Sequence, residues 1–248
     1  MQDVENIYQD AYYRTKCLKG LFIHDISNLF QIISNSIELC ESLLLEEIKK
    51  GDIMGYFQMI VRQLNRGKQL IRNVRNLSDL EEFEMPLAAV EVFSTLKTTI
   101  NFMNISFPTK DIKIRVISDY ETLFLMANEL LSELFENIIT NSINYNNNKV
   151  VQIDIVISVI DFRERNFAKI EFKDNGIGID DTQKKTIFQE NYSKKGHSKG
   201  MGIGLSLVAK LIELYGGTIW VEDRIKGDSS KGTNFIILIP LAKKGDIQ

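Results

Sequence analysis

The first 83 residues carry the hydrophobic pattern of long helices. The stretch 1–83 contains no proline, and apolar residues recur every three or four positions along it. The pattern is interrupted at Gly51 and Gly55, so we predict one helix over 3–50 and a second over 52–82. Helices of this length cannot bury their apolar stripes against each other alone. We therefore predict a hairpin that pairs with a second copy into a four-helix bundle, a homodimer.

The pattern changes after Met85 and Pro86, where short apolar runs with β-branched residues predict strands. The predicted strands are Ala89–Phe93, Ile112–Ser118, Thr122–Met126, Val150–Ile160, Phe167–Lys173, Thr218–Glu222 and Phe235–Pro240. The predicted helices between them are Ser94–Met103, Asn128–Tyr145, Thr182–Gln189 and Gly202–Tyr215. Residues 84–248 are therefore predicted to form an α/β sandwich with helices on one face of a sheet, and the whole chain falls in the α+β class.

Composition and charge exclude several classes of function. The 248 residues are 44% hydrophobic, and the formal net charge of -3 gives no general basic field for nucleic acid or an anionic membrane. Two histidines and two cysteines offer few ligands for a zinc site. No signal-peptide pattern is visible, and no uncharged apolar stretch reaches the roughly 18 residues that span a bilayer. We expect a cytoplasmic protein, or the cytoplasmic portion of a larger sensor, with no membrane contact by this chain.

The predicted helix 128–145 carries a candidate metal pair. Asn137 and Asn141 are four residues apart and so lie on the same face of the helix. Their amide oxygens are suited to hold a hydrated magnesium ion beside a triphosphate. Taken alone, an asparagine pair at this spacing is more often part of a polar surface.

A second candidate segment follows the strand that ends near residue 173. The carboxylate of Asp174 is suited to accept a hydrogen bond from an exocyclic amine. Gly176 and Gly178 allow the backbone to turn and to approach a ligand closely. The same residues also suit an ordinary β-turn.

A glycine run opens the last predicted helix. Gly200, Gly202 and Gly204, followed by Leu205, lead into it and expose backbone N–H groups at its N-terminus, where the helix dipole favours phosphate. Neither a Walker loop nor a good dinucleotide fingerprint fits this run.

Two further segments flank the glycine run. The stretch 193–199 is polar and contains Lys194 and Lys195, which would suit a lid over phosphates or a solvated loop. Gly232 and Thr233 lead into the final strand, and by themselves they indicate no particular function.

The order and spacing of these segments resemble the N, G1, F, G2 and G3 boxes of the histidine kinase catalytic domain, in the ATPase group that includes gyrase, Hsp90 and MutL. The resemblance covers about 150 residues, with 188–192 as the F box. It implies ATP and Mg²⁺ as cofactors, with Asp174 on the adenine amine, Asn141 as main magnesium ligand beside Asn137, and Tyr145 against the adenine. The other implied nucleotide contacts are Gly176, Gly178, Lys194, Lys195, Gly200, Gly202, Gly204, Leu205 and Thr233.

Two positions depart from the patterns of relatives. Many family members carry a basic residue where this chain has Asn144, so a phosphate contact is missing or supplied by the lid. Relatives that activate water place a glutamate where this chain has Asn137. Without that general base, transfer to another nucleophile is favoured over hydrolysis.

The candidate phosphoacceptor is His24. On a helical wheel it shares a polar, uncharged strip with residues such as Asn28, while Ile26, Leu29 and Ile33 lie opposite. The segment resembles the H-box pattern His-Asp/Glu-x-x-Asn/Thr. The resemblance implies that Asp25 orients the imidazole and that Asn28 aligns water for dephosphorylation of a response regulator. Because i and i+1 do not face each other on a helix, Asp25 must reach round through its rotamer or act only when the catalytic domain docks.

These features predict an ATP-dependent protein-histidine kinase. It would phosphorylate its own His24 and pass the phosphoryl group to an aspartate of a response regulator receiver domain, with a phosphatase activity on the same partner. Two alternatives stay open: a catalytically weak scaffold, and an ATP hydrolase of the gyrase and Hsp90 group.

Overall fold

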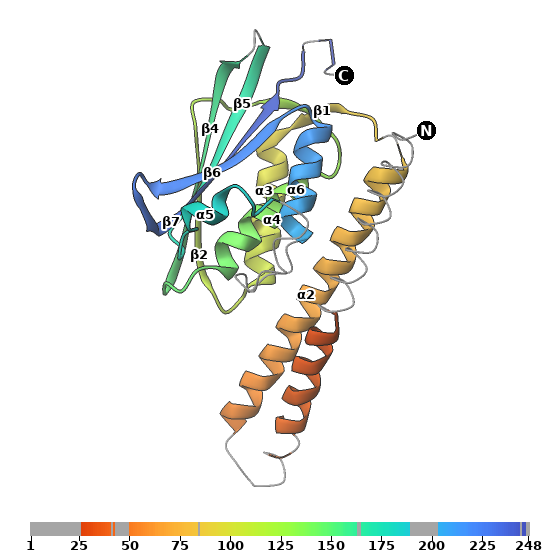
Figure 1. Cartoon of the computed structure of the whole chain (residues 1–248), viewed down its shortest axis with the longest axis vertical. Helices are drawn as coiled ribbons and strands as arrows, with labels where there is room; N and C mark the ends of the chain where they lie inside the picture. The colour runs from red at the N-terminus through yellow and green to blue at the C-terminus, as the bar shows by residue number, and fades with distance from the viewer. Residues whose placement is uncertain are drawn as a thin grey trace. The chain divides into compact units, whose positions relative to one another are not determined.

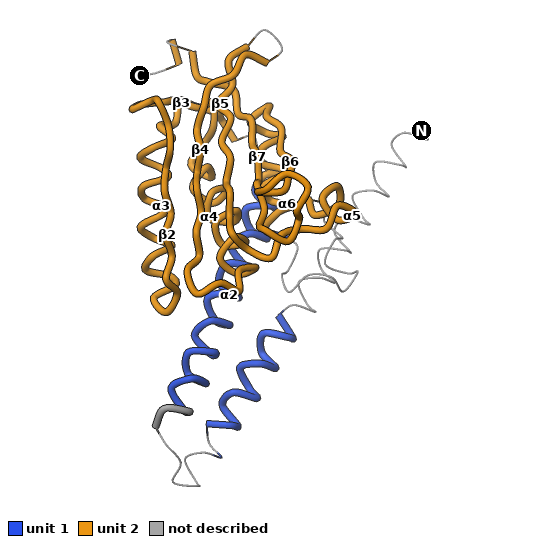
Figure 2. The backbone as a smooth tube through the Cα atoms, turned by 90° about the vertical axis from the view of Figure 1, so that its left-hand side faces the viewer, with its two compact units in different colours: residues 1–79, 193–203 blue, residues 80–192, 204–248 orange. Residues whose placement is uncertain are grey.

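The computed structural model describes most of the chain. The described residues are 26–40, 42, 50–83, 85–162, 165–188, 203–243 and 245–246. In this part of the chain no helix is both long enough and apolar enough to cross a bilayer. Figure 2 colours the two compact units into which the chain divides, residues 1–79 with 193–203 and residues 80–192 with 204–248.

The helical unit contains two described helices. Residues 26–40 form one, and α2 (Lys50–Glu82) forms the other. Leu29 packs against α2, since its Cδ1 lies 3.5 Å from the position of a Cβ added at Gly67. The predicted second helix is confirmed, and the predicted first helix is confirmed over 26–40. His24 and Asp25 lie outside the described residues, as do residues 3–23, 41 and 43–49 of that prediction, and Lys50 lies in α2.

One face of each helix is buried within the unit. The buried residues follow helical spacing, Leu29, Ser36 and Cys40 on the first helix and Gln63, Leu70, Asn73 and Leu77 on α2. A second apolar stripe on each helix is exposed. It consists of Phe30 and Ile37 on the first helix and of Met54, Phe57, Val61, Leu64 and Ile71 on α2. Spacings of three, four and seven residues between its members are typical of a helix seam that packs against further helices.

The second unit is an α/β sandwich (Figure 1). Its elements are β1 (Ala88–Glu91), α3 (Val92–Ser106), β2 (Asp111–Ser118), β3 (Phe124–Ala127), α4 (Leu131–Asn144), β4 (Val150–Phe162), β5 (Arg165–Asp174), α5 (Asp181–Lys184), α6 (Ile203–Leu214), β6 (Thr218–Ile225) and β7 (Asp228–Pro240). A five-stranded sheet has the order β2-β4-β5-β7-β6, and β1 pairs with β3 in a small second sheet. Only the β2–β4 pair in the larger sheet is parallel. Figure 1 shows α3, α4 and α6 together on one face of that sheet.

The core of this unit lies between the sheet and those helices. Every second residue of β4 from Val151 to Ile157 is at most 2% exposed, which is the period of a strand with one face buried. The apolar stripe of α4 packs over this face, and the ring centroids of Phe135 and Phe172 lie 5.8 Å apart. The packed core fixes where the ends of α4, β5 and β7 meet.

Several predicted boundaries differ from the structure. Phe93, predicted at the end of a strand, lies in α3, because the carboxylate of Glu91 accepts hydrogen bonds from the N–H groups of Phe93 and Ser94 and starts the helix early. The predicted helix 182–189 is shorter, since α5 ends at Lys184 and turns follow. The final strand is longer and begins at Asp228, because a two-residue turn ending at Gly227 (φ +83°) pairs it back onto β6.

Candidate nucleotide-binding site

A buried carboxylate lies at the end of β5. Asp174 is its last residue and is 3% exposed. Its Oδ1 accepts hydrogen bonds from the backbone N–H groups of Gly176 (2.8 Å) and Thr233 (3.1 Å). Its Oδ2 accepts one from the hydroxyl of Ser142 on α4 (3.1 Å). The loop after β5, strand β7 and helix α4 therefore converge on a single side chain.

Opposing effects act on the ionisation of Asp174. Burial raises its pKa above the usual range, and this effect exceeds the opposing effects of its hydrogen bonds and of the positive charge of Arg224. The hydrogen bonds that lower the pKa come from Gly176, Thr233 and Ser142. As a carboxylate, Asp174 accepts hydrogen bonds only, so its capacity to receive an amine decreases as the pH falls through its pKa.

Close backbone contacts explain the glycines near Asp174. A Cβ at Gly176 would lie 2.7 Å from the carbonyl oxygen of Tyr145, and one at Gly178 would overlap the carbonyl oxygen of Ser229. A Cβ at Gly232 would overlap the carbonyl oxygen of Asp174. The sequence indicates that Gly176 and Gly178 let the backbone approach a ligand closely. In the structure the same freedom lets separate segments of the chain approach each other.

An asparagine network holds the loop after β5. The Asn175 Oδ1 accepts hydrogen bonds from Asn146 Nδ2 (2.7 Å) and from the backbone N–H of Gln152 (2.8 Å). Its Nδ2 donates to the carbonyl oxygen of Val150 (3.1 Å). Asn148 donates from its side chain to the carbonyl oxygen of Asn175. Residues 146–148, between α4 and β4, thus support the site as well as connect the two elements, a role that the sequence alone did not indicate.

Helix α4 places three predicted residues one turn apart. Asn137 is 4% exposed and its Nδ2 donates to the carbonyl oxygen of Glu133 (2.8 Å), while Asn141 and Tyr145 are half-buried. Within the described residues no group of three or more His, Cys, Asp or Glu side chains is placed to hold a metal ion. Amide oxygens are hard ligands, so this donor set fits a magnesium ion that shares its coordination with phosphates and water.

The remaining predicted residues have different outcomes. Gly204 and Leu205 are half-buried in the first turn of α6, and Asn28 is exposed on the first helix. Lys194, Lys195, Gly200 and Gly202 lie outside the described residues. Phe188, the first residue of the predicted F box, packs edge-on against Phe235, with ring centroids 6.3 Å apart.

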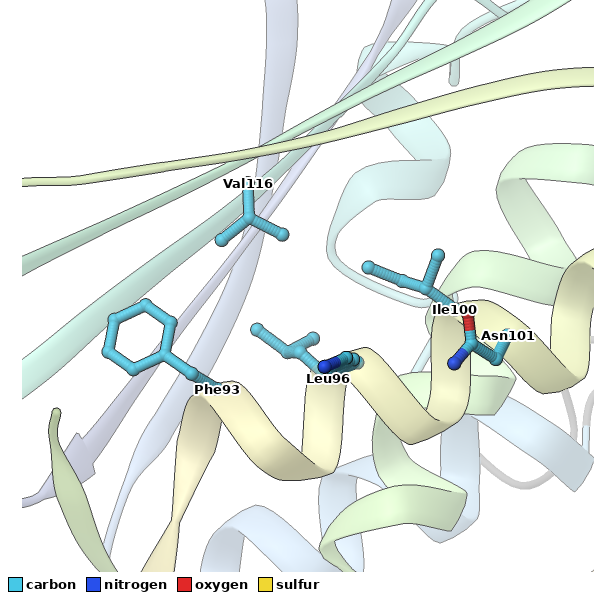
Figure 3. A pocket seen from close by; sticks show the side chains of 6 residues that line it. Phe93, Leu96, Ile100, Asn101 and Val116 are labelled. Atoms are coloured by element: carbon cyan, nitrogen blue, oxygen red, sulfur yellow. The ribbon is translucent and has the colours of Figure 1, made fainter. Parts of the chain in front are cut away.

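Two surface grooves lie apart from Asp174 and from the asparagines of α4. Figure 3 shows the first, where Phe93, Leu96 and Ile100 of α3 face Val116 of β2. The second lies between α5 and β6 and is lined by residues that include Phe188 and Trp220. Asp174 and the asparagines of α4 line neither groove, so the candidate site rests on its hydrogen-bonding groups rather than on the shape of these grooves.

Comparison with protein families identifies one domain. Residues 126–243 match the family model described as histidine kinase-, DNA gyrase B- and HSP90-like ATPase. The chain is 30% identical over 219 residues to the heme sensor protein HssS of Staphylococcus saprophyticus, covering 86% of this chain and 44% of that protein. It is 25% identical over 237 residues to the sensor protein RprX of Bacteroides fragilis, covering 91% of this chain and 44% of that one. The chain thus spans less than half the length of these two relatives.

Solved structures share the fold. The histidine kinase AdeS of Acinetobacter baumannii has a TM-score of 0.59 at 15% identity, covering 89% of this chain and 98% of that one. Full-length ShkA in complex with AMPPNP also has a TM-score of 0.59, at 20% identity, covering 86% of this chain and 46% of that one. The helical region followed by an α/β ATP-binding domain is therefore the architecture of histidine kinases, as the sequence predicted.

Gly232→Ala tests the close contact that surrounds Asp174. The substitution combines a positive φ (+110°) with overlap of the Asp174 carbonyl oxygen, so we expect the free energy of unfolding to fall by about 3 kcal/mol or more. Gly227→Ala is the matched control, because it has a similar backbone (φ +83°) but open space around the added Cβ. It should cost only about 1 kcal/mol. Denaturant unfolding measures both, and equal losses would contradict the close-contact explanation.

Proposed function

Because residues 126–243 form a catalytic ATP-binding domain of the sensor histidine kinase type, we propose that the chain binds ATP with Mg²⁺ and transfers the γ-phosphoryl group to His24. The observation that carries this proposal is the buried carboxylate of Asp174, to which three separate segments donate hydrogen bonds. A fixed carboxylate of this kind recognises the exocyclic amine of adenine by accepting its hydrogen bond.

The phosphates and the metal are assigned to further residues that the sequence singles out. Asn141 and Asn137 hold the magnesium ion, which neutralises charge on the phosphates when bound. Tyr145, at the end of α4, lies against the base, and its carbonyl oxygen already fixes the loop by accepting from Ile177 N–H (3.0 Å). The other nucleotide contacts are assigned to Gly176, Gly178, Lys194, Lys195, Gly200, Gly202, Gly204, Leu205 and Thr233.

Transfer to a side chain rather than to water follows from the residues of α4. A hydrolase needs a general base that activates water beside the γ-phosphate. Asn137 offers an amide, and its Nδ2 is directed to the carbonyl oxygen of Glu133. An amide cannot take the proton of an attacking water at neutral pH, which favours an imidazole as the nucleophile.

The acceptor is assigned to the helical unit. Residues 26–40 form a helix on which Ser27, Asn28 and Gln31 are exposed, so a polar face continues the strip that contains His24 in the sequence. A neutral imidazole on such a face is nucleophilic near pH 7. Asp25 orients the ring, and the phosphoryl group passes to an aspartate of a response regulator. Asn28 positions water for the later hydrolysis of that aspartyl phosphate, which releases inorganic phosphate.

The exposed apolar stripe supports a homodimer. Phe30, Phe57, Val61 and Leu64 are each at least 50% exposed, an arrangement that is costly in water for a helical hairpin. A second copy of the hairpin, which presents the same stripe, covers it in a four-helix bundle.

The variant His24→Gln tests the acceptor. We expect the loss of all acid-labile phosphate on the protein after incubation with labelled ATP, while ATP affinity stays within about twofold of the parent chain, because glutamine removes the nucleophile alone. His197→Gln is the control and should label normally. Labelling retained in His24→Gln would place the acceptor elsewhere. In the parent chain, release of inorganic phosphate without labelled protein would favour a hydrolase. The absence of both inorganic phosphate and labelled protein would favour a scaffold.

The double variant Val61→Glu, Leu64→Glu tests the dimer. Two carboxylates in an apolar seam cost several kcal/mol to bury, so we expect monomers where the parent chain forms dimers. Arg62→Glu, an exposed neighbour on a different side of α2, should remain dimeric. Sedimentation velocity distinguishes the two states, and a dimeric double variant would contradict this interface.

A further inference from the structure

Ser142 is a buried polar residue on the apolar side of α4. It is 3% exposed, with Ile138, Ile139 and Ile143 fully buried around it. A serine inside a helix commonly donates its hydroxyl to the carbonyl four residues earlier. Here the hydroxyl donates instead to Oδ2 of Asp174, which is 32 residues away in the sequence. The sequence interpretation passed over Ser142, although a polar residue on an apolar helix face indicates a buried partner.

The hydrogen bonds of Asp174 leave one acceptor position. A carboxylate offers about four lone-pair sites on two oxygens. Oδ1 receives two backbone N–H groups, while Oδ2 receives only the hydroxyl of Ser142. One lone pair of Oδ2 therefore stays available within these contacts, and its direction is set by the bond from Ser142.

We propose that Ser142 is a positioning residue for recognition of the nucleotide base, whose hydroxyl holds Oδ2 of Asp174 in the orientation that accepts an exocyclic amine. The inference rests on the proposed binding of an adenine nucleotide and adds a residue that acts through Asp174. Two features support it: the hydroxyl is directed out of its own helix, and its partner atom is the carboxylate oxygen with fewer donors.

The surroundings of Asp174 make this role measurable. Burial raises its pKa, whereas the N–H groups of Gly176 and Thr233, the Ser142 hydroxyl and the charge of Arg224 on β6 lower it. Removal of the hydroxyl therefore raises the pKa further. Because Oδ1 accepts from two backbone N–H groups, the added proton binds to Oδ2 and occupies the position that would receive the amine. Binding that depends on the carboxylate is therefore lost at a higher pH.

The test measures the affinity for ADP from about pH 4 to pH 8 by titration calorimetry, because the pKa of Asp174 is raised from its usual value near 3.8. Below the pKa of Asp174, affinity should fall about tenfold per pH unit, as expected for one proton. In Ser142→Ala the midpoint of this fall should lie at higher pH than in the parent chain. Ser142→Thr, which keeps a hydroxyl, should restore the parent midpoint. Ser132→Ala, a serine of the same helix whose hydroxyl bonds to Glu129 and Glu133, should leave it unchanged.

A ligand-free measurement separates this role from a packing effect. Carbon NMR of the Asp174 carboxyl should show a higher pKa in Ser142→Ala than in the parent chain. An unchanged midpoint, or an affinity loss that is equal at every pH, would overturn the inference while leaving adenine binding intact. Failure of the parent chain to bind ADP at any pH would overturn the proposed function and this inference together.

Discussion

The α/β unit depends on the need to satisfy one buried carboxylate. An ionised group taken out of water is costly unless donors surround it, and Asp174 finds its donors in segments 32 and 59 residues away in the sequence. Helix α4 and strand β7 must therefore meet at the end of β5. The glycines at 176, 178 and 232 make this meeting possible, since side chains there would overlap the backbone of neighbouring segments. The asparagine network around Asn175 then fixes the loop that leaves the strand.

The proposed chemistry follows from the hydrogen-bond donors that surround that carboxylate. It follows also from the amide that α4 carries at Asn137, where a hydrolase needs a general base. In the proposed function, Asp174 recognises the base, and the amides of α4 share a metal with phosphates instead of activating water. The proposed nucleophile belongs to the helical unit, whose polar face and exposed apolar stripe serve different partners. The polar face is suited to phosphoryl transfer and to a response regulator, and the apolar stripe is suited to a second copy of the chain.

Much of this arrangement could be predicted from the sequence because it is local. Alternation along 150–160 and the apolar stripe of 128–145 gave β4 and α4 nearly at their observed bounds. The errors came from competing contacts. Glu91 starts α3 early by accepting from Ser94, and polar residues from Asp228 onward pair with β6 although no apolar pattern marks them as a strand. The partners of Ser142, Asn175 and Gly232 are distant in the sequence, so their roles could be seen only once the segments had been brought together.

The central claim, that Asp174 recognises the nucleotide base, is tested most directly by the affinity of Asp174→Asn for ADP at neutral pH. An asparagine at this position places either its NH₂ group or a displaced carbonyl oxygen against the amine of the base. The account therefore predicts that ADP affinity falls by about 3 kcal/mol, or about a hundredfold, while the circular dichroism spectrum stays native. Asp154→Asn, which removes a carboxylate that pairs with Arg115 on β2, should bind like the parent chain. Parent-like affinity in Asp174→Asn would contradict the account.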